Sequence, residues 1–357
     1  MDGVRLAASK VALLVGLHEY GDVSEAILDY VYQGHEELLE SDAKTLQLRI
    51  VSQDEEIRSL VAKTGKKLAP QLKEILLWTE QRKETTSLET AQELLKGVDG
   101  LVATAQKKQK LVAEEAAEIK RLISERIRLS YGARNEDVAL QTYEKSTGCT
   151  VRLTNELFYF LLFPNVDDSS TELDFSALER QIRTRVVSKG QILRSNEEES
   201  EGDAENSEGG AYFSICGMVD GVTDTLEIME DDDWQLVPIV IEVKNRMRAF
   251  RVPPPLYDHI QMAVYMKMVD VRAGDLVQCL NNDRTSIHIS RVSLDAYPLS
   301  SSSMASAGLW VSVLLPRLYT VAQTIYKFRR NDRLRLAYLN GSESERMEML
   351  RRECDFL

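Results

Sequence analysis

The sequence predicts an α/β protein in which helices flank a mixed β-sheet. Segments rich in β-branched and aromatic residues begin near residue 148 and recur between residues 211 and 295, with a helical segment at 255–269 among them. Residues 35–130, by contrast, repeat apolar side chains at about 3.6-residue intervals, the period of a helix. A long helical block and a strand-rich region therefore share one chain.

The composition is that of an ordinary globular protein. The 357 residues are 43% hydrophobic and 28% charged, so a substantial core can form. The net charge of −13 is concentrated, because residues 197–208 hold seven acids and residues 224–233 hold six. The other 44 acids balance 44 lysines and arginines. The acidity therefore does not argue against a polyanionic partner.

The cysteines and apolar runs predict an intracellular protein. The four cysteines are more than sixty residues apart in sequence and match no metal-ligand spacing, which favours free thiols in a reducing compartment. The apolar run at 11–17 is short and lacks a cleavage site, so we expect no secretion. No run approaches the roughly 18–20 apolar residues that span a bilayer. Nuclear, mitochondrial and cytoplasmic locations stay open.

The N-terminal half predicts helices. Residues 6–34 read as two short helices, the first beginning at Ser9, a favourable N-cap. Residues 35–128 predict two or three long helices in a hairpin or arm. This block either packs simply as an arm or presents a coiled-coil-like surface to a protein partner or to a second copy.

The C-terminal half alternates strands and helices. A helix over 134–146 precedes a strand-like segment that ends near residue 163, and residues 195–210 predict a flexible acidic loop. Strands are expected at 212–229 and 236–245, a helix at 255–269, and strands at 275–280 and 286–294. A long helix over 303–329 supplies apolar cover.

The segment PIVIEVKNR (238–246) places Glu242 and Lys244 on one face of an apolar strand, because side chains two apart share a face. This face either holds a structural salt bridge or lines a polar cleft, since unpaired buried charges are costly. Asp220 lies in a turn upstream. Two carboxylates with the main-chain carbonyl of Val243 are hard oxygen ligands of the kind that Mg²⁺ or Mn²⁺ prefers, and Lys244 can orient a metal-bound water.

Gln261 and Tyr265 lie four residues apart on the predicted helix over 255–269, so they share one helical face. This amide and phenol can hold Lys244 or a phosphate group. Taken alone, polar residues with this spacing more often form a solvated stripe.

The order Asp, Glu-x-Lys and Gln-x-x-x-Tyr, in the segments GMVD, EVK and QMAVY, resembles the PD-(D/E)XK nuclease superfamily in its RecB-like branch. The segments YGARNEDVALQTYEKSTGCTV and LAASKVALLVGLHEY are similar to parts of the lambda exonuclease and YqaJ viral recombinase family. The resemblance covers residues 6–34 and 128–295. It implies a restriction-endonuclease-like central sheet, with a core formed by 1–34 and 129–302, a helical insertion at 35–128, and C-terminal helices at 303–357.

The resemblance also implies a function, the metal-dependent hydrolysis of DNA, often from an end, in DNA repair or recombination. The expected partner is DNA, as duplex ends or as a single strand. Its catalytic set would be Glu136, Asp220, Glu242, Lys244, Gln261 and Tyr265. Glu136 is the acid of the first motif and would bind the metal directly or through water. Branches with an iron–sulfur cluster carry closely spaced cysteines that are missing here, so no cluster is expected.

Several residues are candidates for binding phosphate or DNA. The resemblance implies a terminal-phosphate contact for Ser9, with Arg5 as the nearest basic residue. Lys327, Arg329 and Arg330 form a separate basic cluster, although cations also stabilise the C-terminal end of a helix. Two other functions stay open: a catalytically silent nucleic-acid-binding or assembly protein with the nuclease fold, and an RNA endonuclease on the same scaffold.

Overall fold

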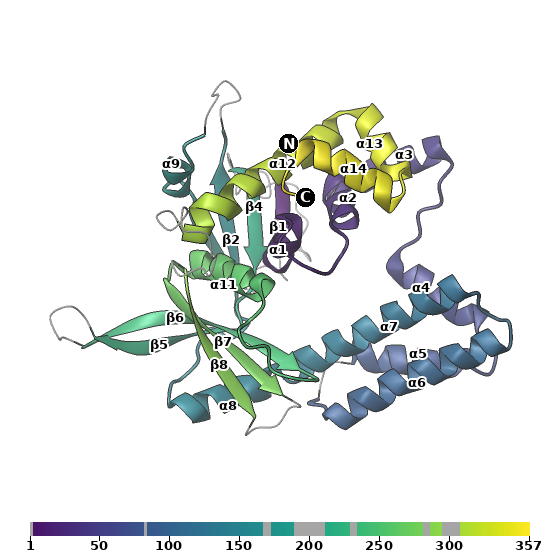
Figure 1. Ribbon diagram of the computed structural model, residues 1–357, viewed down its shortest axis with the longest axis horizontal. Coiled ribbons are helices and arrows are strands. Elements are labelled where there is room, and N and C mark those ends of the chain that lie inside the picture. Colours follow the sequence, from purple (N-terminus) through teal and green to yellow (C-terminus); the bar gives the residue numbers. More distant parts are fainter. Residues whose placement is uncertain are drawn as a thin grey trace.

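The computed structural model describes residues 3–81, 84–166, 173–188, 211–228, 234–280, 286–294 and 308–357. The predicted acidic loop at 195–210 and the start of the predicted helix at 303 lie outside these ranges. Helices and mixed sheets confirm the α/β class (Figure 1). The expectation of one central sheet is corrected, because the described strands form two four-stranded sheets.

The first sheet has the strand order β1 (Val4–Ala7), β4 (Ala211–Gly217), β2 (Leu157–Pro164) and β3 (Arg183–Ser188). β1 runs parallel to β4, while β2 runs antiparallel to both β4 and β3. Helix α12 (Leu315–Arg330), which follows the π-helical turn η2 (Trp310–Leu314), packs on this sheet. The ring of Tyr319 on α12 meets Phe163 and Phe213 edge-on.

The N-terminal segment differs from its prediction. β1 is a strand where only helices were expected, and its Val4 and Leu6 are fully buried. Ser9 does not cap a helix but lies in the short 3-10 turn η1 (Ala8–Lys10). Helices α1 (Val11–Leu14) and α2 (Val23–Tyr32) follow. A four-residue strand was not recognisable locally, because its pairing partner lies about two hundred residues away, at Phe213.

The second sheet has the order β5 (Gly221–Ile228), β6 (Trp234–Arg246), β7 (Ala273–Leu280) and β8 (Ile287–Ser293). The central pair β6–β7 is parallel, and both outer pairs are antiparallel. The connection between β6 and β7 contains α11 (Leu256–Val269), which confirms the helix predicted over 255–269.

Strand β6 is covered on both faces. Helix α8 (Glu136–Thr147) packs Leu140 and Tyr143 against Ile241 and Val243 on one face. Helix α11 covers the opposite face and also contacts β2, so it lies between the two sheets (Figure 1). The five residues from 239 to 243 are consequently all buried.

The chain changes sheets between β4 and β5, which are separated by only three residues. A β-carbon added at Gly217 would lie 2.9 Å from the β-carbon of Ala8, and one at Gly221 would lie 2.3 Å from Val151 Cγ1. Glycine permits these close approaches because it has no side chain. The stretch at 212–229 was expected to belong to one sheet, with a turn at Asp220. It is instead two strands in different sheets, with Asp220 at the crossing.

Helices α4 (Gln53–Lys63), α5 (Ala69–Glu80), α6 (Leu88–Lys107) and α7 (Ala113–Arg134) pack around a separate core, and we call them the α4–α7 bundle. The bundle extends away from the two sheets (Figure 1). Asn135 alone separates the end of α7 from the start of α8, so no loop intervenes between the bundle and the helix that packs on the second sheet. Within the described residues, no helix is long and apolar enough to cross a membrane.

A buried ion pair ties α3 (Glu36–Leu46) to α13 (Asp332–Asn340). Arg335 donates from Nε to Asp42 Oδ2 at 2.6 Å and from Nη2 to Oδ1 at 3.2 Å. Both side chains are less than one-tenth exposed, and the hydroxyl of Tyr32 also donates to Asp42 at 2.8 Å. Helix α3 precedes the α4–α7 bundle in the chain, but it packs with the C-terminal helices.

The variant Asp42→Asn should lower the free energy of unfolding by about 3–5 kcal/mol near neutral pH, because Arg335 loses its buried counter-charge and keeps only the exposed carboxylate of Asp332 as an ion-pair partner. The hydrogen bond from Arg335 holds the pKa of Asp42 below its ordinary value of 3.8. Because the pKa of Asp42 is lower in the folded state, its ionised form stabilises the fold at pH values above 3.8. This contribution is lost as the pH falls through the lowered pKa. Urea titrations from about pH 7 downward measure the difference, which should shrink in acid.

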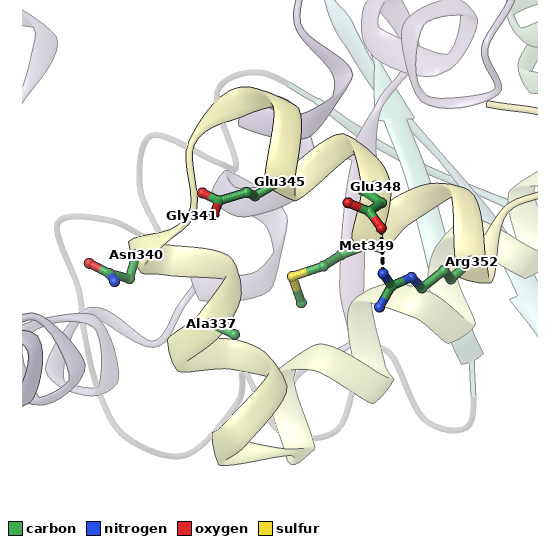
Figure 2. A pocket seen from close by; sticks show the side chains of 7 residues that line it. All are labelled: Ala337, Asn340, Gly341, Glu345, Glu348, Met349 and Arg352. Atoms are coloured by element: carbon green, nitrogen blue, oxygen red, sulfur yellow. Dashed lines mark hydrogen bonds and ion pairs between the residues drawn. The ribbon is translucent and has the colours of Figure 1, made fainter.

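The matched control is Glu348→Gln on α14 (Glu343–Glu353). Glu348 pairs with Arg352 one turn along the same helix, beside a shallow cavity between α13 and α14 (Figure 2). Both side chains are about two-thirds exposed, so the loss should stay below about 0.5 kcal/mol. Equal losses for the two variants would contradict the importance of the buried pair.

Candidate active site

Four of the predicted residues form one hydrogen-bonded network between β6 and α11. Lys244 donates from Nζ to Glu242 Oε1 at 2.7 Å and to Gln261 Oε1 at 2.8 Å. The amide nitrogen of Gln261 lies 2.9 Å from Glu242 Oε1 and 3.0 Å from the hydroxyl of Tyr265. The charged pair therefore faces α11, while its strand neighbours Ile241 and Val243 pack under α8.

The second oxygen of Glu242 differs from the first, because it has no hydrogen-bond partner among the described residues. The side chain of Glu242 is only 5% exposed, and both donors just described bind Oε1. Within the described residues, Oε2 is buried and accepts no hydrogen bond. Buried polar atoms are normally satisfied, and a bare carboxylate oxygen is especially costly. Oε2 is therefore positioned for a ligand from outside the chain, such as a water or a cation.

Asp220 immediately precedes β5, whose first residue is Gly221, and it lies beside Val243 of β6. The amide nitrogen of Val243 donates to Asp220 Oδ2 at 2.7 Å. The N–H and C=O of one strand residue project to the same side, so the carbonyl of Val243 also faces the edge where Asp220 lies. Burial raises the pKa of Asp220 well above its ordinary value, and the charges of Glu242 and Glu136 raise it further. Asp220 and Glu242 thus compete for positive charge at one place.

Glu136 approaches from the opposite side of the sheet, as the first residue of α8. Burial raises the pKa of Glu136, the hydrogen bond from Asn155 opposes this effect, and the charge of Glu242 adds to it. Asn155 was not anticipated from the sequence. It has a positive φ of 51°, a conformation that asparagine tolerates better than most residues.

Lys244 and Tyr265 both stay protonated at neutral pH. Burial lowers the pKa of Lys244, but the carboxylates of Glu242, Asp258 and Asp220 raise it by more, so the net pKa lies above its ordinary value. Burial, followed by the charge of Glu242, raises the pKa of Tyr265. Both groups can donate hydrogen bonds and stabilise negative charge, but neither is a base.

The donor set fits a hard divalent cation in its chemistry. Oxygen atoms of Asp220, Glu242 and the Val243 carbonyl match the preferences of Mg²⁺ and Mn²⁺, and Glu242 Oε2 accepts no hydrogen bond from the described residues. The described residues nevertheless contain no group of three or more His, Cys, Asp or Glu side chains close enough to hold a metal ion. Without a cation between them the negatively charged carboxylates repel one another, which favours larger distances between their oxygen atoms.

A second polar contact joins β6 to α11 beyond Lys244. Arg246 donates from Nη2 to Asp258 Oδ2 at 2.5 Å and from Nε to Gln278 Oε1 at 3.0 Å. Asp258 and Gln278 are both buried. The sequence contained a signal for this contact, because Arg246 lies two residues after Lys244 and therefore shares its face.

Two asparagines, Asn245 on β6 and Asn135 between α7 and α8, attach the α4–α7 bundle to the site. Asn245 donates from Nδ2 to the carbonyl of Gly132 at 2.9 Å. Asn135 accepts from the amide nitrogen of Thr86 at 3.1 Å. These two asparagines directly adjoin Lys244 and Glu136 in the chain, so the bundle is bonded next to two candidate catalytic residues.

The candidates for phosphate binding divide into two groups. Ser9 is exposed in η1, and the preceding Ala8 lies beside Gly217, which in turn approaches Tyr265, so η1 borders the site. Arg5 places its guanidinium 5.7 Å from the ring centroid of Phe160 in the first sheet.

The C-terminal basic cluster has structural partners. Lys327 forms an ion pair with Glu353 at 2.7 Å. Arg329 donates to the main-chain carbonyls of Tyr30 and Val31, and Arg330 lies over the ring of Tyr326. The contacts of Lys327 and Arg329 fasten α12 to α14 and α2, whereas Arg330 and Tyr326 both belong to α12.

Two cavities lie away from the network. One of 330 Å³ between α13 and α14 is lined by Glu345, Met349 and their neighbours (Figure 2). Another of 660 Å³ runs along α5 and α6, beside Trp78 and Leu94. Neither includes a residue of the network.

Comparison with known proteins adds no assignment. No family model matches the chain, and no curated protein matches it. A solved structure described as the crystal structure of SSO0001 is 13% identical, and the match covers 73% of this chain and 87% of that one. The TM-score is 0.26, too low to support a conclusion about fold or function.

The variant Gly217→Ala should lower the free energy of unfolding by about 1–3 kcal/mol, because the added methyl group overpacks a full site. Its β-carbon would lie 2.9 Å from that of Ala8 and 3.3 Å from Tyr265 Cε1. Gly100→Ala in α6 is the control, since no described atom outside the neighbouring backbone of α6 lies within 4 Å of the added carbon and alanine favours a helix by up to about 1 kcal/mol. Chemical denaturation compares the two. A stabilising effect of Gly217→Ala would contradict the described packing.

Proposed function

We propose that this chain is a metal-dependent nuclease that hydrolyses DNA phosphodiester bonds from DNA ends, in DNA repair or recombination. The observation that carries the proposal is the buried Glu242, which binds Lys244 through one oxygen and leaves the other without a described partner. We also propose that the two sheets with α11 and α8 form a restriction-endonuclease-like core, into which the α4–α7 bundle is inserted.

Asp220, Glu242 and the Val243 carbonyl would hold Mg²⁺ or Mn²⁺, with Glu136 binding directly or through a water. When bound, such an ion polarises the phosphate and lowers the pKa of a coordinated water, which is the nucleophile in hydrolysis. An ion is also what allows a phosphodiester to approach, because three carboxylates would otherwise repel it.

The protein groups then act on the phosphate and on one another. Lys244, held protonated by the adjacent carboxylates, supplies a fixed positive charge that stabilises the charge developing on the phosphate oxygens. Gln261 accepts a hydrogen bond from Lys244 and donates one to Tyr265, so it fixes the direction of the ammonium group. Removing one electrostatic group of this kind typically costs about 10²–10³ in rate.

The variants Glu242→Gln and Lys244→Met should each reduce DNA cleavage by about 10²–10⁴-fold. Lys244→Met also lowers the free energy of unfolding, because Glu242 is left buried without its counter-charge, so cleavage is compared at a temperature where both variants are folded. Cleavage is measured on end-labelled linear, circular and single-stranded DNA and on RNA, with Mg²⁺, Mn²⁺ or EDTA. Cleavage of linear DNA alone by the wild-type protein supports the exonuclease. Metal-dependent cleavage of RNA alone would instead indicate an RNA endonuclease, and no cleavage of any substrate would indicate a silent binding protein.

Two control variants change the same residue types outside the network. Asp224→Asn alters a carboxylate on β5 that pairs with Arg152, and Lys267→Met alters a lysine on α11 that pairs with Glu179. Both should retain activity within about threefold, because neither group reaches the candidate site. A control as inactive as Glu242→Gln would contradict the assigned roles.

Mg²⁺ or Mn²⁺ should raise the melting temperature of the wild-type protein, and removal with EDTA should reverse the increase. Ligand at a hundred times its dissociation constant stabilises a fold by about 2.7 kcal/mol. Asp220→Asn should lose this increment, although its amide oxygen can still accept from the Val243 N–H. Thermal unfolding with and without metal provides the measurement. A full increment in Asp220→Asn would rule out Asp220 as a ligand.

A further inference from the structure

We propose that a row of side chains beside the candidate site, formed by Tyr20, His18, Tyr257 and Arg251, is a stacking platform for a single-stranded nucleic acid. We call these four residues the ring row. The inference rests on the proposed function in one respect, that the bound nucleic-acid strand leads from the ring row to the candidate site. Binding to the ring row itself requires no cleavage.

The ring row is continuous. The rings of His18 and Tyr257 are stacked, with centroids 4.4 Å apart and an interplanar angle of 29°. Tyr20 meets His18 edge-on at 6.2 Å. At the other end, the guanidinium of Arg251 lies 5.9 Å from the Tyr257 centroid and donates to the Tyr257 hydroxyl. Tyr20 is 61% exposed, so one large aromatic ring of the row is open to solvent.

The ring row continues the polar stripe of the site. Tyr257, Gln261 and Tyr265 are spaced by four residues on α11, so they share one side of the helix. At about 1.5 Å of rise per residue, Tyr257 lies about 6 Å along α11 from Gln261. One step of a DNA strand is about 3.4 Å in duplex form, so the row begins within about two nucleotides of the network.

The charge around the row suits a polyanion. Lys10 lies close enough to His18 to influence its titration, and both Lys10 and Arg251 are exposed. The nearby carboxylate of Asp258 is neutralised by Arg246, which leaves Glu19 as an adjacent exposed acid. Burial lowers the pKa of His18 below its ordinary value of 6.5. His18 is therefore a neutral aromatic surface at neutral pH.

The chemistry selects a single strand over a duplex. An aromatic side chain stacks on the face of a base, and in a duplex those faces are already covered by neighbouring bases. Stacking is tolerant of base identity, because every base presents a π-face. We therefore expect the ring row to bind unpaired strands of many sequences and to contribute little to the binding of blunt duplexes.

The test measures binding of the full chain in EDTA, where no cleavage occurs. The probe is a fluorescein-labelled oligo(dT) of about 16 nucleotides, within the usual range of single-strand sites, and the readout is fluorescence anisotropy. Tyr20→Ala should weaken binding by about tenfold or more, and Tyr20→Trp should preserve it. Trp234→Ala is the matched control, because Trp234 is 63% exposed at the far end of β6 and should have no effect.

Further arms decide the substrate and separate the two proposals. Tyr20→Ala should change the affinity for a blunt duplex by less than about twofold. If Tyr20→Ala loses affinity equally for oligo(dT) and oligo(U), the platform binds both DNA and RNA. If it loses affinity for only one of them, the platform is specific for that nucleic acid. Unchanged oligo(dT) binding by Tyr20→Ala overturns the inference even if DNA is cleaved. If binding depends on Tyr20 but the protein cleaves no substrate, the platform is supported and only the proposed nuclease activity is contradicted.

Discussion

A carboxylate buried at the end of an apolar strand has to be paired, and Glu242 places this requirement on everything around it. Lys244 supplies the counter-charge from the same strand, and Gln261 supplies the amide that holds both. Helix α11 must therefore lie against this face of β6, and it consequently separates the two sheets. Tyr265 occupies the adjoining space only because Gly217 lacks a side chain there.

The sequence predicted the parts of the site that depend on local periodicity. Strand alternation placed Glu242 and Lys244 on one face, and helical spacing placed Gln261 and Tyr265 on another, and the structure brings these faces together. The crossing at Asp220 was not predictable in the same way. Strand-like residues continue through it, and the two sheets are specified by long-range partners such as Ile241 for Gly221 and Val151 beside it.

Arginine and lysine illustrate a second limit of local sequence. A cluster such as Lys327, Arg329 and Arg330 reads equally as a phosphate site and as a set of structural contacts, because the charge is the same in both. What separates the two is the identity of distant partners. Arg335 finds Asp42 at a separation of 293 residues, and Arg329 finds the carbonyl of Val31 at 298. No window of sequence contains both members of these pairs.

The loop-free junction at Asn135 has a mechanical consequence. Helix α7 has 22 residues and is thus about 33 Å long, and its last turn is bonded to Asn245 while α8 starts immediately with Glu136. A force on the far end of the bundle is therefore transmitted along α7 to the residues next to Glu136 and Lys244. A small rotation of α7 that moves its far end by several ångströms moves the end beside these residues by only a fraction of an ångström, which is the scale that decides hydrogen-bond geometry.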